Sequence, residues 1–377
     1  MRALLGASLL SAAAGLPLHL LPLLIAAVIA QGKLPLAQAG WVASACLAGQ
    51  LVASIALPLL GFTHLKRSHA AIAIATLLVA VLCSSLPFAG SLLVSWFVVG
   101  LACGNLYFLA TTTAAAQPNR EAAFAVRLSL TLVVSGLAIF ALQLAKGFND
   151  YTTLAFQLSI VFAVLTLLGL WMYEPPQSTA GLSAAEQNAP RKPNVAPSEG
   201  RWHGLLVIFI VFVGQPGFWA YAVQNVQQRG VALEHVAYAI AFCKLAAGLW
   251  LYVNSKYRSK VQTKPLAAAD FLLPGLVLVV ALLCMSLAKV ALVFMLGVLL
   301  WELSLNVLSA RLQAAVVNDN PSRAGIWLTA AVFLGASTGP ALHGLALQFG
   351  VGAVFIAYAC MSALAPFVWL QLKAKVS

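Results

Sequence analysis

Residues 174–202 read EPPQSTAGLSAAEQNAPRKPNVAPSEGRW, and no other long stretch of this 377-residue chain is both polar and rich in proline. This composition is typical of a flexible linker. The flanking sequence is the opposite, because A, V, I, L, M, F, W, Y and C make up 62% of the chain and charged residues only 8%. The linker therefore predicts two separate apolar parts, residues 1–173 and 203–377.

The low charge excludes most classes of soluble protein. Soluble chains carry about 25% charged residues, so this chain cannot cover itself with a surface that water wets, and we expect it to fold in a lipid bilayer. A secreted domain, a cytosolic enzyme and a disordered protein are excluded. The net charge of +12 does not indicate a nucleic-acid partner, because membrane proteins collect Lys and Arg on one side of the bilayer.

The sequence predicts neither a cofactor nor a metal. It contains no nucleotide-binding Gly-x-x-x-x-Gly-Lys-Ser/Thr loop, which excludes ATP as the direct energy source within this chain. The six cysteines lie in apolar runs without metal-ligand spacing, so we expect core residues rather than a disulfide framework or a zinc site. They are Cys46, Cys83, Cys103, Cys243, Cys284 and Cys360.

Twelve apolar segments are long enough to cross a bilayer, for which a helix needs about 20 residues. The first follows Arg2 directly and greatly exceeds the apolar core of a signal peptide, which is about 7–15 residues long, so we interpret it as a membrane helix. The sequence thus predicts an all-α membrane protein with two six-helix bundles. The predicted helices are 4–30, 36–61, 69–88, 90–114, 121–146, 151–173, 203–227, 233–255, 266–287, 289–312, 323–346 and 349–372.

The basic residues predict the orientation. With the N-terminus in the cytoplasm, the inner side collects Arg2, Lys66, Arg67, Arg120, Arg127, Arg191, Lys192, Arg201, Lys256, Arg258, Lys260, Lys264, Arg311, Arg323, Lys373 and Lys375. The outer side has Lys33, Lys146, Arg229 and Lys289. Cytoplasmic loops carry the excess of Lys and Arg, so we expect both termini and the linker to be cytoplasmic.

The two apolar parts resemble each other at three places with nearly the same spacing along the chain. Gly15-Leu16-Pro17 matches Gly214-Gln215-Pro216, Trp41 and Cys46 match Tyr238 and Cys243, and the loop 117–120 matches the loop 320–323. Duplicated halves related by an axis along the membrane normal are a transporter architecture, with the solute site near the midplane between the halves. The sequence therefore predicts an internal repeat.

Six plus six helices, a polar linker and basic inner loops resemble the major facilitator superfamily over the whole chain. The family's loop between the second and third helices usually reads Gly-x-x-x-Asp-Arg/Lys-x-Gly-Arg/Lys. Gly61 and Lys66 match this pattern, whereas Leu65 stands at the acidic position and His69 at one that is often basic. The resemblance implies two pseudo-symmetric bundles around a central site, acting as a monomer in the cell (inner) membrane.

The glycine–proline motif of the family's drug–proton antiporters separates this chain from that branch. The motif belongs in the fifth helix, where this chain has Ser135-Gly136 without proline. A GxxxGP string lies instead in the eleventh helix, from Gly335 to Pro340. A drug–proton exporter remains the alternative within the family.

Two ionisable residues lie deep within predicted helices, where a charge costs about 2.5–3.5 kcal/mol on insertion scales. Lys244 and Glu302 are at about the same depth, because their helices run in the same direction and each residue rises 1.5 Å. They could form a buried pair that only holds helices together. Alternatively, Glu302 takes up a coupling proton or cation and Lys244 neutralises an anionic group of the solute.

Further candidates are a histidine, several amides and an indole near mid-depth. His19 lies between Pro17 and Pro22 and has a pKa suited to a proton relay, or it is a hydrogen-bonded structural residue. The amides and the indole could contact the solute or simply join helices. They are Asn105, Gln215, Gln224, Asn225, Asn306 and Trp301.

These residues predict a secondary active transporter of a small organic solute that works by alternating access. Glu302 and His19 are both titratable at membrane depth, which favours proton coupling, with sodium as the alternative. A membrane-embedded enzyme would need a clustered acid–base set, and Glu302 is the only acidic residue deep in a predicted helix. A channel remains open, and we expect no enzymatic activity.

Overall fold

The computed structural model describes residues 2–60, 67–86, 89–117, 119–173, 200–261, 268–319 and 324–376. Most of the predicted linker, the loop from Gly61 to Lys66 and the loop 320–323 lie outside these residues. Within them the regular elements are all helices. The helices are α1 (Arg2–Ala30), α2 (Leu36–Leu59), α3 (Arg67–Cys83), α4 (Ala89–Ala115), α5 (Arg120–Leu144), η1 (Gly147–Asn149), α6 (Tyr151–Met172), α8 (Gly200–Gln227), α9 (Leu233–Val261), α10 (Ala269–Leu287), α11 (Ala291–Asp319), α12 (Ala324–Gln348) and α13 (Gly352–Val376).

Each predicted membrane helix corresponds to one long helix of the structure, and the all-α class is confirmed. Within the described ranges, eleven helices are long and apolar enough to span a membrane, and α3 is the shorter twelfth. The α3 helix ends at Cys83 rather than 88, and the chain continues in tighter turns, in which the Ser85 N–H donates to Leu82 O and the Leu86 N–H donates to Cys83 O, each at 3.1 Å. The α9 and α11 helices continue past 255 and 312, since hydropathy marks only the apolar part of a helix.

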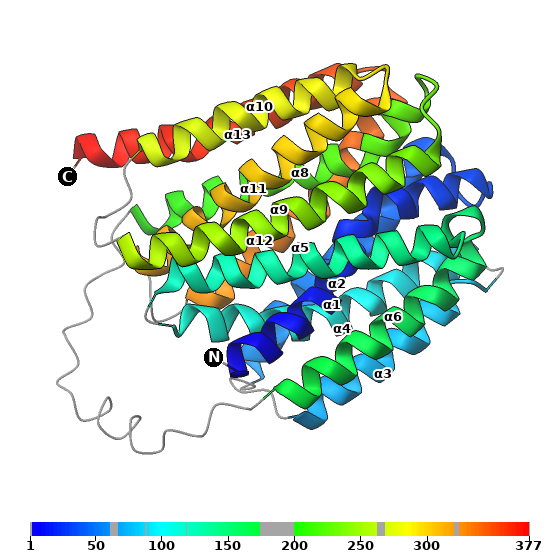
Figure 1. Cartoon of the computed structure of the whole chain (residues 1–377), viewed down its shortest axis with the longest axis horizontal. Coiled ribbons are helices and arrows are strands. Elements are labelled where there is room, and N and C mark those ends of the chain that lie inside the picture. Colours follow the sequence, from blue (N-terminus) through cyan, green and yellow to red (C-terminus); the bar gives the residue numbers. More distant parts are fainter. Residues whose placement is uncertain are drawn as a thin grey trace.

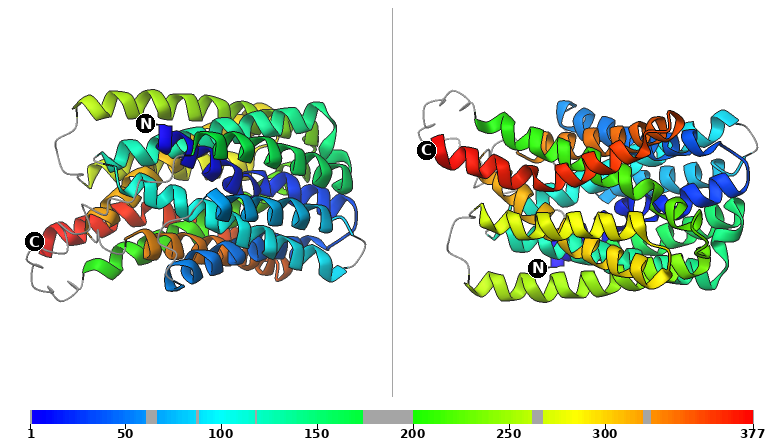
Figure 2. Two further views of the ribbon diagram at one scale, coloured as in Figure 1. Left: turned by 90° about the horizontal axis from the view of Figure 1, so that it is seen from below. Right: turned by 90° about the horizontal axis from the view of Figure 1, so that it is seen from above.

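The helices run roughly along the long axis of the molecule, and both chain termini lie at the same end (Figures 1 and 2). We call this the terminal end. The opposite end, called the far end, carries the connections 31–35 between α1 and α2 and 228–232 between α8 and α9. An even number of crossings places both termini at one end.

The α1 and α8 helices are central. In each, 83% of the most apolar window is buried inside the protein, compared with 33% in α13. Peripheral helices expose large apolar side chains, among them Trp171 on α6 and Leu273 on α10. This outward-facing apolar surface suits a bilayer rather than water. The matched Gly-x-Pro segments therefore lie on the two helices at the centre of the bundle.

The first six helices meet the last six along two seams. In the α5–α9 seam, a side chain at Gly136 would meet the backbone of Ala241, and the Ser129 hydroxyl donates to Gly248 O at 2.7 Å. Glycine therefore lets these two helices approach closely. Ring contacts extend the seam toward the far end, where Phe140 lies 5.8 Å from Tyr238.

The α2–α12 seam lies near the far end. A side chain at Gly40 would meet the backbone of Pro340 and the hydroxyl of Tyr221 on α8. The Gly40 N–H donates to the Tyr221 hydroxyl at 3.0 Å, and that hydroxyl donates to Leu36 O at 3.3 Å. The first and last six helices are thus joined at the far end by close backbone contact and neutral hydrogen bonds.

Candidate functional site

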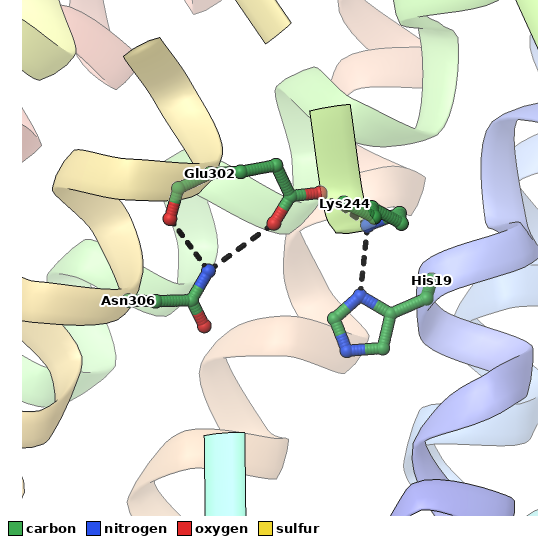
Figure 3. A network of polar contacts seen from close by, with 4 residues as sticks. All are labelled: His19, Lys244, Glu302 and Asn306. Carbon is green, nitrogen blue, oxygen red and sulfur yellow. Dashed lines mark hydrogen bonds and ion pairs between the residues drawn. The ribbon is translucent and has the colours of Figure 1, made fainter. Parts of the chain in front are cut away.

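A buried charged cluster lies between α1, α9 and α11 (Figure 3). Lys244 forms an ion pair with Glu302 Oε1, and both side chains are fully buried. The Lys244 ammonium also lies 3.0 Å from His19 Nδ1. Each of these three residues is eleven positions from the far end of its helix, so the predicted matched depth of Lys244 and Glu302 is seen as direct contact.

Asn306 completes the cluster. It lies one helical turn after Glu302, and its Nδ2 donates to Glu302 O at 2.7 Å and to Glu302 Oε2 at 3.1 Å. Both carboxylate oxygens of Glu302 are therefore bonded, one by the ammonium of Lys244 and one by an amide. Because a protonated Lys only donates, the nitrogen of His19 that faces it acts as an acceptor, which makes His19 neutral.

Two stacked indoles flank the charged cluster. The rings of Trp219 and Trp301 are 4.6 Å apart and inclined by 12°. The Lys244 ammonium lies 5.0 Å from the Trp219 ring centre, where the ring face attracts a cation. The Trp301 indole N–H donates to Gln215 Oε1 at 3.0 Å, and Gln215 in turn donates to Ala359 O at 2.9 Å. The α13 backbone thus helps to fix the orientation of Trp301.

A cavity of about 80 Å³ lies next to the cluster. Residues of α1, α4, α5, α8 and α11 line it, so it lies between the first six and the last six helices. His19, Glu302 and Trp219 are in its wall, and Lys244, which contacts all three, is not among the lining residues. A buried water needs a cavity volume of roughly 10–15 Å³, so this cavity has room for several waters.

The cavity follows one face of α11. Glu302, Asn306, Ser309 and Gln313 line it at intervals that keep them on one side of the helix. With a rise of 1.5 Å per residue, Glu302 and Gln313 are about 16 Å apart along α11. The cavity therefore reaches from the charged cluster toward the terminal end.

Most of the predicted site residues lie together, and three do not. His19, Glu302, Asn306 and Trp301 line the cavity, and Lys244 and Gln215 contact them. The remaining three amides are not among the lining residues: Asn105, Gln224 and Asn225. Gln224 and Asn225 are half-buried and lie more than two turns beyond Gln215 toward the far end, whereas Asn105 buries an Oδ1 that has no partner in the described residues.

Sequence reasoning missed two buried arginines. Arg127 and Arg311 were expected among the basic residues of the inner side, but the structure exposes 0% of Arg127 and 7% of Arg311. The burial of Arg127 could have been inferred from its position two turns inside the predicted helix 121–146. Arg311 was missed because α11 continues for two more turns than predicted.

Arg127 lines the cavity and is held by neutral groups. Its Nη1 donates to Thr111 Oγ1 at 2.6 Å, and its Nη2 donates to Gln313 Oε1 at 3.0 Å and to the Tyr107 hydroxyl at 3.3 Å. The guanidinium carbon also lies 4.6 Å from the Tyr107 ring centre. These contacts join α5 to α4 and, across the cavity, to α11.

Arg311 lies outside the cavity wall and has acidic surroundings. Its Nη1 donates to Asp270 O, and its Nε lies 3.9 Å from Glu121 Oε1. Because Glu121 is on α5 and Arg311 on α11, this ion pair is a further charged contact between the first and last six helices.

Sequence comparison identifies no relative: no protein-family sequence model matches the chain. Among curated proteins, likewise, none matches.

Comparison of structures, in contrast, finds strong similarity over the whole chain. A mutant of the nucleoside transporter NupG superposes with a TM-score of 0.71 and 11% identity, covering 97% of this chain and 99% of that one. The human organic anion transporter MFSD10 (TETRAN) superposes with a TM-score of 0.67 and 17% identity, covering 98% of each chain. NupG without that mutation superposes with a TM-score of 0.67 and 12% identity, covering 98% of this chain and 99% of that one.

These similar structures are transporters rather than enzymes, and the likeness includes all twelve helices. The chain has the fold of the major facilitator superfamily transporters.

Proposed function

We propose that this chain is a secondary active transporter that moves a small organic solute across the cell membrane by alternating access, coupled to protons. The observation that carries this proposal is Glu302, a fully buried carboxylate in the wall of a cavity between the first and last six helices. Charged groups at membrane depth mark ion and substrate pathways. The similar structures, which are transporters of nucleosides and of organic anions, support an organic solute.

Coupling follows from the electrostatics of the cluster. With Glu302 ionised, its charge and that of Lys244 cancel, and the pair draws α9 and α11 together. A proton on Glu302 removes the carboxylate charge and leaves the ammonium of Lys244 with only His19 and the Trp219 ring face as partners. The cluster then carries one buried positive charge, which is costly without an opposite partner. Separation of the first and last six helices lets water reach this charge, so proton binding and separation favour each other.

The helix contacts support a pseudo-symmetric arrangement of two halves, residues 1–173 and 203–377, joined by the linker 174–202. A two-fold relation between the halves exchanges the second helix, α2, with the eighth, α9, and the fifth, α5, with the eleventh, α12. It therefore turns the contact of α2 with α12 into the contact of α9 with α5, and both contacts are present. It likewise pairs the contact of α1 with α6 and the contact of α8 with α13.

The same proposal includes the orientation and the assembly. The excess of Lys and Arg predicted on one side supports a cytoplasmic position for the terminal end. The far end then faces outward, and the cavity lies between the halves of one chain. We propose that a monomer is sufficient for transport, because the cavity lies between the two halves of one chain.

The test begins with a thermal-shift screen of the purified protein against metabolites, because a ligand of the folded state raises stability by RT ln(1 + [L]/Kd). A hit is then radiolabelled and measured in vesicles. Counterflow, in which unlabelled solute on one side accelerates entry from the other, is expected of a carrier. If the solute crosses without such stimulation, the protein is a channel and the carrier proposal is wrong.

Coupling is tested with Glu302→Gln. This variant is expected to lose accumulation driven by a proton gradient and to keep counterflow, because exchange requires no net proton movement. Glu234→Gln is the matched control, since it makes the same chemical change at an exposed residue of the first turn of α9. If Glu302→Gln concentrates the solute as the wild type does, or if a sodium gradient alone drives accumulation, the proton proposal is wrong.

A further inference from the structure

Arg127 is a permanent charge at the end of the cavity opposite the charged cluster. Its side chain is fully buried, and a guanidinium does not release its proton within a protein. Its three hydrogen-bond acceptors are the oxygens of Thr111, Tyr107 and Gln313, all of which are uncharged. Within the described residues, Arg127 therefore has no counterion.

The charges around the cavity do not balance. Among the described residues that line it, Glu302 is the only acidic one, and Lys244 already neutralises it. The remaining formal charge is the guanidinium of Arg127. A buried charge without an opposite partner is costly, and an ion pair with a ligand would remove that cost.

The guanidinium also has unused hydrogen-bonding capacity. It carries five N–H donors, of which the three contacts use three, and its buried Nε has no partner in the described part of the chain. An oxyanion accepts two N–H donors of an arginine side by side. Gln313 is on α11, so separation of α5 and α11 would release a further donor from Nη2.

From these observations we infer that Arg127 binds an oxyanionic group of the solute, a carboxylate or a phosphate. This inference rests on the proposed transport function and specifies its substrate class. The oxyanion takes the place of the Gln313 amide oxygen at Nη2 and adds the Nε donor. The remainder of the solute extends along the cavity face of α11 toward Trp301, whose ring stacks on Trp219 in the same wall.

The experiment compares acids with isosteric neutral amides by thermal shift in detergent. The probes are benzoate, nicotinate and phenyl phosphate, with benzamide and nicotinamide as the neutral counterparts. We expect at least one oxyanion to stabilise the wild type and the amides to have no effect. Arg127→Gln should weaken binding of that oxyanion about tenfold or more, since it removes charge-assisted hydrogen bonds, and Arg127→Lys should retain part of it.

Arg229→Gln is the matched control, because it removes a cation from an exposed position at the far end. It should bind the oxyanion as the wild type does. The inference is overturned if no oxyanion stabilises the wild type, if the amides stabilise it equally, or if Arg127→Gln binds as tightly as Arg229→Gln. If Arg127→Gln does not fold, the comparison of acid with amide on the wild type and on Arg127→Lys decides the question.

Binding in detergent requires no gradient, so the two proposals can fail separately. If oxyanion binding depends on Arg127 but vesicles show no counterflow, the transport proposal is contradicted and the binding-site proposal is supported. If counterflow of a solute is unaffected by Arg127→Gln, the binding-site proposal is contradicted and the transport proposal is supported.

Discussion

The first and last six helices meet in two chemically different ways. Along the α5–α9 and α2–α12 seams, glycines bring backbones together and the polar contacts are neutral, as in the bond from Ser129 to Gly248 O. In the cavity between the seams, the contacts are charged: Lys244 bonds His19 across the interface, and Arg127 bonds Gln313.

This difference separates two tasks. Neutral seams made of small residues can shift against each other without burying or exposing a charge, whereas under the proposed function each charged contact in the cavity would change its energy when a proton or a solute binds. The seams therefore determine how closely the two sets of helices approach, and under the proposed function the cavity determines which state they favour.

The largest effect is expected from breaking the ion pair. Lys244→Gln leaves Glu302 as an uncompensated buried carboxylate and should lower the free energy of unfolding by about 3–5 kcal/mol. The double variant with Glu302→Gln should recover much of this loss, because two amides can hydrogen-bond without a buried charge. Thermal unfolding in detergent measures both, and a double variant less stable than Lys244→Gln would contradict the account.

A seam substitution should cost less than the broken pair. Gly136→Val inserts a side chain against the backbone of Ala241, and overpacking of this kind costs about 1–3 kcal/mol. Transport should fall as well, because α5 and α9 can no longer approach. Gly90→Val is the control, since a side chain at Gly90 meets nothing within 4 Å. Equal stability of the two variants would show that the seam is not tightly packed.

A smaller effect is expected at the far end. Tyr221→Phe removes the hydrogen bonds to Gly40 N and Leu36 O, each of which contributes about 1 kcal/mol. The α2–α12 seam should then open more often. A reporter cysteine, Ala37→Cys, should react faster with an impermeant maleimide in the Tyr221→Phe background, and an unchanged rate would exclude Tyr221 as a contact that closes this end.

The smallest effect is expected outside the spans. Asp150 precedes α6 and accepts the Thr153 N–H at 2.7 Å, and this hydrogen bond lowers the pKa of Asp150 below its ordinary value of 3.8. Its stabilising effect is therefore present above that value and is lost as the pH falls through the lower pKa of the folded state. Asp150→Asn keeps a cap and should remove this part of the pH dependence, a few tenths of a kcal/mol, seen as the pH falls from neutral through and below 3.8.

Thermal midpoints measured across that pH range check the last prediction. Asp150→Asn and the wild type should differ above the ordinary pKa of Asp150 and converge at the acidic end. A constant difference at every pH would mean that the charge of Asp150 contributes nothing to the cap.

The sequence was sufficient for the positions of the helices and for one contact within the site. Long apolar segments are determined by the thickness of a bilayer, so residue counting found each helix, and equal depth brought Lys244 to Glu302. Depth alone does not fix a site, because the face of a helix that points inward depends on its neighbours. For this reason Asn105 was expected in a site that it does not line, although Tyr107 of the same helix lines it.

Arg127 shows the opposite case: it was not expected in the site, yet it lines the cavity. A long basic side chain two turns inside a membrane helix can extend along the helix to the headgroups, and from the sequence Arg127 was counted only among the basic residues of the inner side. The structure turns it inward, because Tyr107 and Thr111 on α4 and Gln313 on α11 supply acceptors for it. Those acceptors come from helices far apart in the chain, and no local pattern contains them.

The described length of α3 bears on how the protein would fit a membrane. From Arg67 to Cys83 the helix is about 26 Å long, whereas the hydrocarbon core of a typical bilayer is about 30 Å thick. Ile72 and Val79 of α3 face outward, on the side that a bilayer would cover. We expect bilayers built from shorter lipids to accommodate this flank of the protein with less deformation.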